Sequence, residues 1–163
     1  MWLNDIILVI GTACEVLAVL MVLWRWRRYA SLPAYIGLVL LHVSTYIYLP
    51  TRTFVFWGIC TLIVLMLCRM LPKGEPEGRK SGGLLIGVSS LAGCLLGILV
   101  GARVMVLGVI VGAVVGTIAY GRSPEGGWIM SSHKTALSYF CSQALPIVVA
   151  VSEVGIAVEG FIF

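Results

Sequence analysis

The chain has 163 residues, of which 60% are hydrophobic and only 11% are charged, and its formal net charge is +4. Soluble domains carry about 25% charged residues, so this composition excludes an ordinary soluble protein. The apolar residues form long blocks rather than one face of each helix, which indicates segments surrounded by lipid. We therefore predict an all-α fold, a polytopic bundle of transmembrane helices that forms a single domain over residues 1–163.

The apolar blocks predict six membrane spans, three on either side of one loop. Their approximate bounds are 5–24, 34–50, 53–71, 83–101, 104–120 and 137–160. The first group occupies residues 1–71 and the second occupies residues 83–163. The prolines and glycines that crowd residues 72–82 predict a flexible loop between the groups. The two groups would have opposite topology, as in many transporters, although they share no residue-level similarity.

The positive charges are distributed unevenly around these spans. Nine of the eleven Lys and Arg residues fall on the side that the chain reaches after the first, third and fifth spans. They are Arg25, Arg27, Arg28, Arg69, Lys73, Arg79, Lys80, Arg122 and Lys134, whereas Arg52 and Arg103 fall on the other side. By the positive-inside rule the first side is cytoplasmic, which places the 72–82 loop inside and both termini outside. These charges indicate orientation in a lipid bilayer, and we predict no nucleic-acid partner.

Glycines at four-residue spacing mark the fourth and fifth predicted spans. They are Gly93, Gly97 and Gly101 in the fourth span and Gly108, Gly112 and Gly116 around the fifth. Small residues at this spacing let two helix backbones approach closely in a bilayer. Because few residues separate the two stripes, we predict a tight antiparallel helical hairpin.

The glycine stripes leave two alternatives open. They pack the hairpin internally, or they bind a second copy or another membrane protein. The hairpin could cross the membrane, or it could enter the membrane and return to the same side. We favour a hairpin that crosses, because it keeps most Lys and Arg residues on one side of the membrane.

Polar residues within the apolar spans are the candidate functional residues. Glu15 lies near the middle of the first span, His42 lies in the second, and Gln143 and Glu153 lie in the sixth. An ionised acid at the centre of a membrane helix costs several kcal/mol, so Glu15 is expected to face other helices. Glu153 lies nearer the outer side, and the alternative for it is exposure to the outer water. We predict that these four residues form an intramembrane polar cluster that handles protons or ions. The alternative is a structural role as neutral hydrogen-bonding groups.

Motifs of enzymes and metal sites are absent from the sequence. There is no HExxH, no GxSxG and no phosphate-binding glycine loop followed by Lys and Ser or Thr. The five cysteines all fall within predicted spans and form no CxxC pair. We therefore predict a protein that is not an enzyme and that uses neither a cofactor nor a metal.

Four segments carry a family resemblance. They are Leu32–Leu41 in the second span, Phe56–Ile59 in the third, the glycine-rich stretch Gly93–Gly121, and Thr135–Leu137 at the start of the last span. In these the chain resembles the uncharacterised bacterial inner-membrane family called domain of unknown function 456. The resemblance implies a location in the bacterial cytoplasmic (inner) membrane and a multi-span architecture. It implies no activity, because the family has no established one.

The chain also departs from that family's pattern at three places. Arg25–Arg28 stands where family members tend to have a Pro- and Gly-rich loop, and Cys68 and Arg69 stand where an acid is common. The prolines that commonly separate the two glycine-rich helices are missing.

Two functions follow from these features. The first is a non-enzymatic packing or accessory subunit that associates through its small-residue helix faces. The alternative is a small transporter or channel with a polar path through Glu15, His42 and Glu153.

Overall fold

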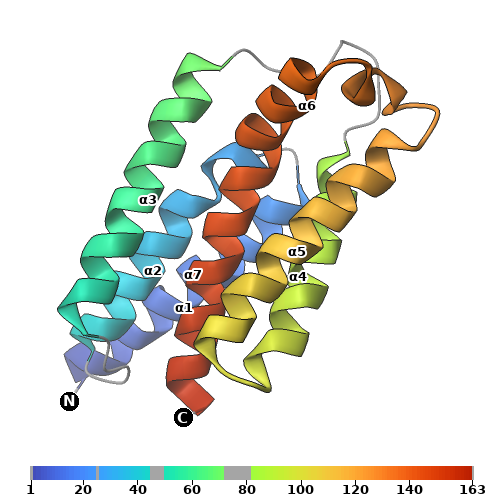
Figure 1. The fold of residues 1–163 in the computed structure, drawn as a ribbon. Coiled ribbons are helices and arrows are strands. Elements are labelled where there is room, and N and C mark those ends of the chain that lie inside the picture. The colour runs from blue at the N-terminus through green and yellow to red at the C-terminus, as the bar shows by residue number, and fades with distance from the viewer. Residues whose placement is uncertain (1, 25, 45–49, 72–81, 163) are drawn as a thin grey trace.

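The computed structural model describes residues 2–24, 26–44, 50–71 and 82–162, and all regular elements among them are helices. The long helices are α1 (Trp2–Leu23), α2 (Ser31–Val43), α3 (Thr51–Met70), α4 (Gly83–Ile98), α5 (Ala102–Gly121) and α7 (Leu145–Ile162). Shorter elements are η1 (Arg27–Tyr29), η2 (Gly127–Ser131), α6 (His133–Tyr139) and the π-helical turn η3 (Phe140–Ala144). Figure 1 shows the long helices running side by side in alternating directions. The prediction of an all-helical fold is confirmed.

Four helical stretches are long and apolar enough to cross a membrane. They are α1, α3, α5 and the continuous stretch His133–Ile162. By contrast, α2 has 13 residues and α4 has 16. At about 1.5 Å per residue these two helices are about 20 and 24 Å long, shorter than a hydrocarbon core of about 30 Å. The end of the predicted second span, at residues 45–49, and most of the predicted 72–82 loop lie outside the described residues.

The central element of the bundle is α7. Each of the helices α1 to α5 packs against it, as Figure 1 shows for the red helix between the others. Its residues from Pro146 to Ala157 are buried, apart from the half-buried Val154. The outer helices instead expose large apolar side chains, such as Leu17 of α1, Leu62 of α3 and Val111 of α5. An apolar exterior of this extent fits lipid rather than water as the surrounding medium.

A π-helical turn joins α6 to α7. In it, the backbone amide of Leu145 donates to the carbonyl of Phe140, five residues earlier. Pro146 follows directly, and because proline has no amide hydrogen it cannot donate to the carbonyl of Ser142, four residues before it. The wider turn therefore lies where the α-helical hydrogen-bond pattern is broken by Pro146.

The helices α4 and α5 approach each other most closely. A Cβ atom at Gly93 would overlap the Gly108 carbonyl, and one at Gly112 would overlap the Ser89 carbonyl. Gly97 meets the backbone of Met105 in the same way. These are contacts with backbone atoms, which no side-chain rotation can relieve. The absence of side chains at these positions therefore allows the two helix backbones to touch.

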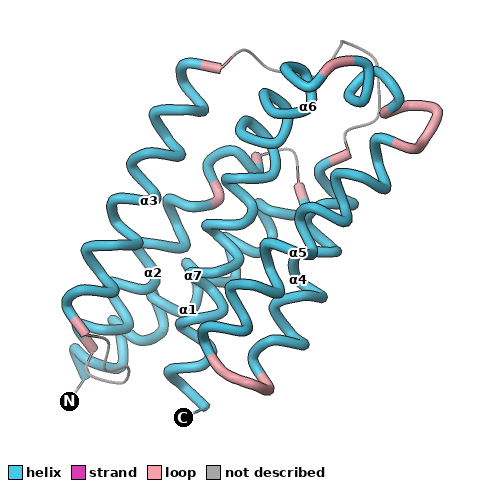
Figure 2. The backbone as a smooth tube through the Cα atoms, in the orientation of Figure 1, coloured by secondary structure: helices cyan, strands magenta, loops and turns pink. Residues whose placement is uncertain are grey.

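Gly101 differs from the other glycines of the two stripes. It lies in the short connection between α4 and α5, seen at the lower end of Figure 2. No atom comes within 4 Å of the place where its Cβ would be, and its φ is 131°. Gly101 therefore does not pack helix against helix, as the sequence pattern predicted. It supplies a backbone conformation that side chains disfavour.

Gly101→Ala is expected to destabilise the protein by about 1–3 kcal/mol, because alanine is strained at this φ even though there is room for its methyl group. Denaturant unfolding in detergent micelles measures the effect. Gly127→Ala is the matched control, since its Cβ would also have nothing within 4 Å and no positive φ is involved. Equal stability of the two variants would contradict the assignment.

The described Lys and Arg residues lie near the ends of the bundle. The end where α2 and α4 begin carries Arg27, Arg28, Arg69, Arg122 and Lys134, and we call it the basic end. The opposite end, where α3 and α5 begin and α7 ends, carries Arg52 and Arg103.

Candidate functional site

Glu153, on the central helix α7, is the starting point of the candidate site. Its side chain is fully buried, with 0% exposure. One carboxyl oxygen, Oε1, lies 2.6 Å from the Thr61 hydroxyl of α3. The other oxygen, Oε2, has no hydrogen-bond partner among the described residues. Burial of an ionised carboxylate without a cation costs far more than burial of a neutral acid.

The Thr61 hydroxyl connects Glu153 to the backbone of α3. Its oxygen lies 2.9 Å from the carbonyl oxygen of Trp57, one turn earlier in the same helix. A hydroxyl carries one hydrogen and can donate it to one acceptor at a time. When Glu153 is protonated, both hydrogen bonds can form at once: the Glu153 carboxyl donates to the Thr61 hydroxyl, and the Thr61 hydroxyl donates to the Trp57 carbonyl. An ionised Glu153 requires the Thr61 hydrogen for itself, and the Trp57 carbonyl then loses that hydrogen bond.

Glu15, on α1, is a second buried acid in the same part of the bundle. It is 8% exposed, and neither of its carboxyl oxygens has a hydrogen-bond partner among the described residues. The carboxyl lies against Gly37 of α2, where an added Cβ would come within 2.8 Å of Oε1. The charges of Glu15 and Glu153 are close enough to repel each other. Two acids from α1 and α7 are thus brought together between α2 and α3.

The other two predicted site residues are His42 and Gln143. His42 is half-buried, and its ring contacts the Phe54 ring of α3 at a tilt of 54°, with 4.5 Å between the ring centroids. Gln143 is buried in the π-helical turn, ten residues before Glu153. Ten residues correspond to about 15 Å along a helix axis. The structure therefore brings together Glu15 and Glu153 and adds Gly37 and Thr61, which the sequence analysis did not single out.

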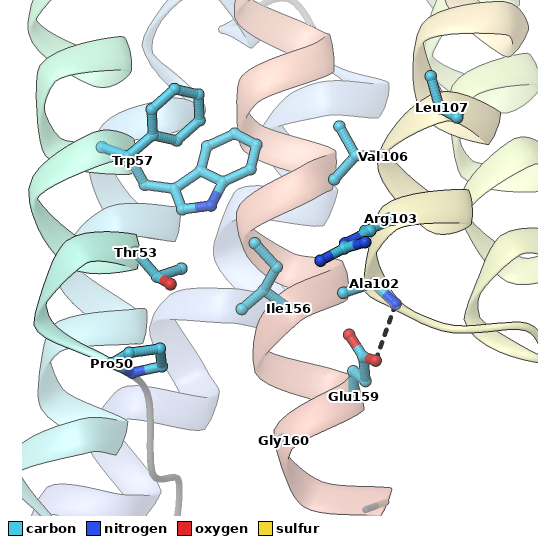
Figure 3. A pocket seen from close by; sticks show the side chains of 11 residues that line it. Pro50, Thr53, Trp57, Ala102, Arg103, Val106, Leu107, Ile156, Glu159 and Gly160 are labelled. Carbon is cyan, nitrogen blue, oxygen red and sulfur yellow. Dashed lines mark hydrogen bonds between the residues drawn. The ribbon is translucent and has the colours of Figure 1, made fainter.

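An open cavity of about 680 Å³ lies between α3 and α5, with α7 as its floor (Figure 3). Both flanking helices pack on α7. Its deeper wall includes Trp57 and Ile156, and its mouth lies at the opposite end of the bundle from the basic residues. Trp57 precedes Thr61 by one turn and Ile156 follows Glu153 by one turn, so each pair shares a helix face. These two side chains therefore lie between the cavity and the Glu153–Thr61 contact.

The mouth of the cavity carries one acid and one base. The Glu159 carboxylate accepts a hydrogen bond of 2.8 Å from the backbone amide of Ala102, the first residue of α5. This bond satisfies an amide that has no partner within its own helix, and the helix dipole favours an anion there. Arg103 is exposed at the same mouth. Figure 3 draws the bond from Ala102 to Glu159 and none from Arg103 to the residues around it.

The described ranges contain no group of three or more His, Cys, Asp or Glu residues placed to hold a metal ion.

Comparison of the chain with models of known protein families, with curated proteins and with solved structures finds no match. The resemblance to domain of unknown function 456 therefore stays a prediction.

Proposed function

We propose that this protein is a small transporter or channel of the bacterial cytoplasmic membrane that moves protons through Glu15 and Glu153. The observation that carries the proposal is the buried chain from Glu153 through the Thr61 hydroxyl to the Trp57 carbonyl. Acids within membrane helices are costly and are typical of proton relays. The proposal concentrates the predicted polar path on Glu15 and Glu153, the two acids buried in the bundle.

The proposed topology has six passes, with the basic end in the cytoplasm. The helices α2 and α4 are short, yet they run between the same two ends as their longer neighbours (Figure 1). Among the described residues, five Lys and Arg side chains lie at the basic end and two at the opposite end. The positive-inside rule then places the start of α1 and the end of α7 outside. In this topology α4 and α5 form a hairpin that crosses the membrane.

The glycine faces support internal packing rather than association with a partner. Gly93, Gly97 and Gly112 all meet backbone atoms of the neighbouring helix within this chain. An accessory subunit that used these faces would have to separate α4 from α5. For this reason we propose transport instead of the predicted accessory role.

Proton transfer through the pair follows from the single hydrogen of Thr61. When the Glu153 proton passes to an ionised Glu15, the Thr61 hydroxyl turns toward the new Glu153 carboxylate, and when the proton returns to Glu153 the hydroxyl turns back toward Trp57. Glu15 and Glu153 are both buried, and among the described residues no cation is bonded to either carboxyl group, so two ionised acids there would repel and are disfavoured. A proton on one acid therefore favours ionisation of the other. This coupling provides two exchangeable positions in the middle of the bundle.

Replacement of both acids by glutamine tests the proposal. The purified protein is reconstituted in liposomes, and proton flux driven by a potassium diffusion potential is followed with an internal pH dye. Glu15→Gln with Glu153→Gln is expected to reduce the flux to that of empty liposomes. The fold should be retained, because an amide has nearly the shape of a neutral carboxyl group.

The matched control is Glu159→Gln, which changes an acid at the mouth of the cavity and keeps an oxygen that can accept from the Ala102 amide. This variant is expected to conduct protons as the wild type does. Flux in the double variant equal to wild type, or no flux above empty liposomes in the wild type, would contradict the proposal.

A further inference from the structure

We infer that the cavity between α3 and α5 binds a single-chain amphiphile with an anionic headgroup, its tail in the cavity and its headgroup at Arg103. The volume of about 680 Å³ is in the range of small-molecule sites, which are about 300–1,000 Å³. This binding site goes beyond the proposed proton path, since it uses none of Glu15, Glu153 or Thr61.

The body of the cavity suits an apolar tail. Its walls are formed by aromatic and aliphatic side chains, among them Phe56, Trp57, Val106 and Ile156. Water in such a space would find few hydrogen-bonding partners, whereas an alkyl chain would gain from leaving water. The cavity therefore selects against a wholly polar ligand such as free phosphate.

The rim of the cavity is open to the apolar surroundings of the bundle. Phe56 on α3 and Leu107 on α5 both line the cavity, yet they are 59% and 60% exposed. Their outer faces belong to the apolar exterior that fits lipid. A tail can therefore enter from the side, between α3 and α5, without first crossing water.

The charge at the mouth selects the headgroup. Arg103 presents an exposed guanidinium there, while the nearby Glu159 carboxylate already accepts from the Ala102 amide at the positive end of α5 (Figure 3). The negative charge of Glu159 is thus partly balanced within the protein, and that of an incoming headgroup would be balanced by Arg103. Arginine forms two parallel hydrogen bonds with phosphate or carboxylate, which favours an anionic headgroup.

Quenching of tryptophan fluorescence provides the test. The protein is placed in phosphatidylcholine nanodiscs and titrated with an alkyl phosphate that carries a nitroxide on its tail. Saturable quenching is expected, and Trp57→Phe should remove it, because Trp57 lines the cavity. The same nitroxide chain with a trimethylammonium headgroup should produce no saturable component, and inorganic phosphate should not compete.

Two arginine variants decide the role of the headgroup. Arg103→Gln is expected to weaken binding of the alkyl phosphate by about tenfold or more, as for the loss of a charged hydrogen bond. Arg52→Gln is the matched control, because it removes the same charge at the same end of the bundle but lies outside the cavity. It should bind as the wild type does. Since Arg103 is exposed, neither change disturbs the core.

The inference is overturned by equal binding of the phosphate and ammonium probes, by an Arg103→Gln variant with wild-type affinity, or by saturable quenching that survives in Trp57→Phe. The Glu15→Gln, Glu153→Gln double variant separates this inference from the proposed function. It should bind the alkyl phosphate normally while its proton flux is lost. If the double variant lost binding of the alkyl phosphate, the inference that this site is independent of Glu15 and Glu153 would also be wrong.

Discussion

Gly112→Leu is expected to abolish the folded monomer. A Cβ at this position would overlap the carbonyl oxygen of Ser89 and lie 3.0 Å from the Cα of Ser90. Both are backbone atoms of α4, so only separation of the helices could make room. Overpacking a core by a few methylene groups costs about 1–3 kcal/mol where side chains can yield, and here they cannot. Gly112→Ala should show the same effect in weaker form.

The yield of monodisperse protein after extraction in a mild detergent measures this loss. Val111→Leu is the control, since Val111 precedes Gly112 on α5 but is 60% exposed on the outer surface. It should give the wild-type elution profile in size-exclusion chromatography. A monodisperse Gly112→Leu protein at wild-type yield would show that α4 and α5 do not touch here.

Thr61→Val is expected to slow proton flux about 100-fold, the lower range for removal of a positioned proton-transfer group. Valine keeps the branched shape of threonine and lacks the hydroxyl that lies between Glu153 and Trp57. Thr61→Ser restores a hydroxyl and should retain most of the flux. The measurement is the same liposome assay as for the two acids.

Thr117→Val is the control for loss of a buried threonine hydroxyl. In α5 this hydroxyl donates to the Ala113 carbonyl, within its own helix. The variant should conduct protons as the wild type does. A Thr61→Val protein with unchanged flux would contradict a path through this hydroxyl, whatever the role of Glu153.

The helices themselves were predictable because lipid leaves few structural choices. Every backbone amide and carbonyl inside a bilayer needs an internal partner, so long apolar segments such as those of α1 and α5 become helices. The central place of α7 was not predictable in the same way. When lipid and the protein interior are both apolar, hydropathy alone does not distinguish an outer helix from a buried one.

The two acids could be singled out because charge is rare in apolar segments, but their neighbours could not. Hydropathy gives the approximate depth of a residue and not the face of the helix on which it lies. His42 and Gln143 were grouped with Glu15 and Glu153 by depth; the structure places the His42 ring against Phe54 and places Gln143 in the π-helical turn, ten residues before Glu153. Nothing in the sequence pattern assigned Thr61 to the site, because the hydroxyl of a threonine in a membrane helix commonly bonds to the backbone of its own helix.

The cavity could not be predicted from the sequence, because its lining residues come from separate helices. Trp57, Arg103 and Glu159 come from three helices that are far apart in the chain. Their meeting depends on the arrangement of α3 and α5 around α7, which no local pattern encodes.

The central position of α7 has a consequence for the order of assembly. The ribosome releases α7 only after it has made α1 to α5, and synthesis proceeds at about 5–20 residues per second. The α4–α5 pair can close before then, because its glycine contacts involve no other helix. Glu153 and Thr61 cannot meet until α7 inserts among the helices already made. The proposed proton path therefore forms only after α7 has inserted, and no intermediate that lacks α7 can leak protons through it.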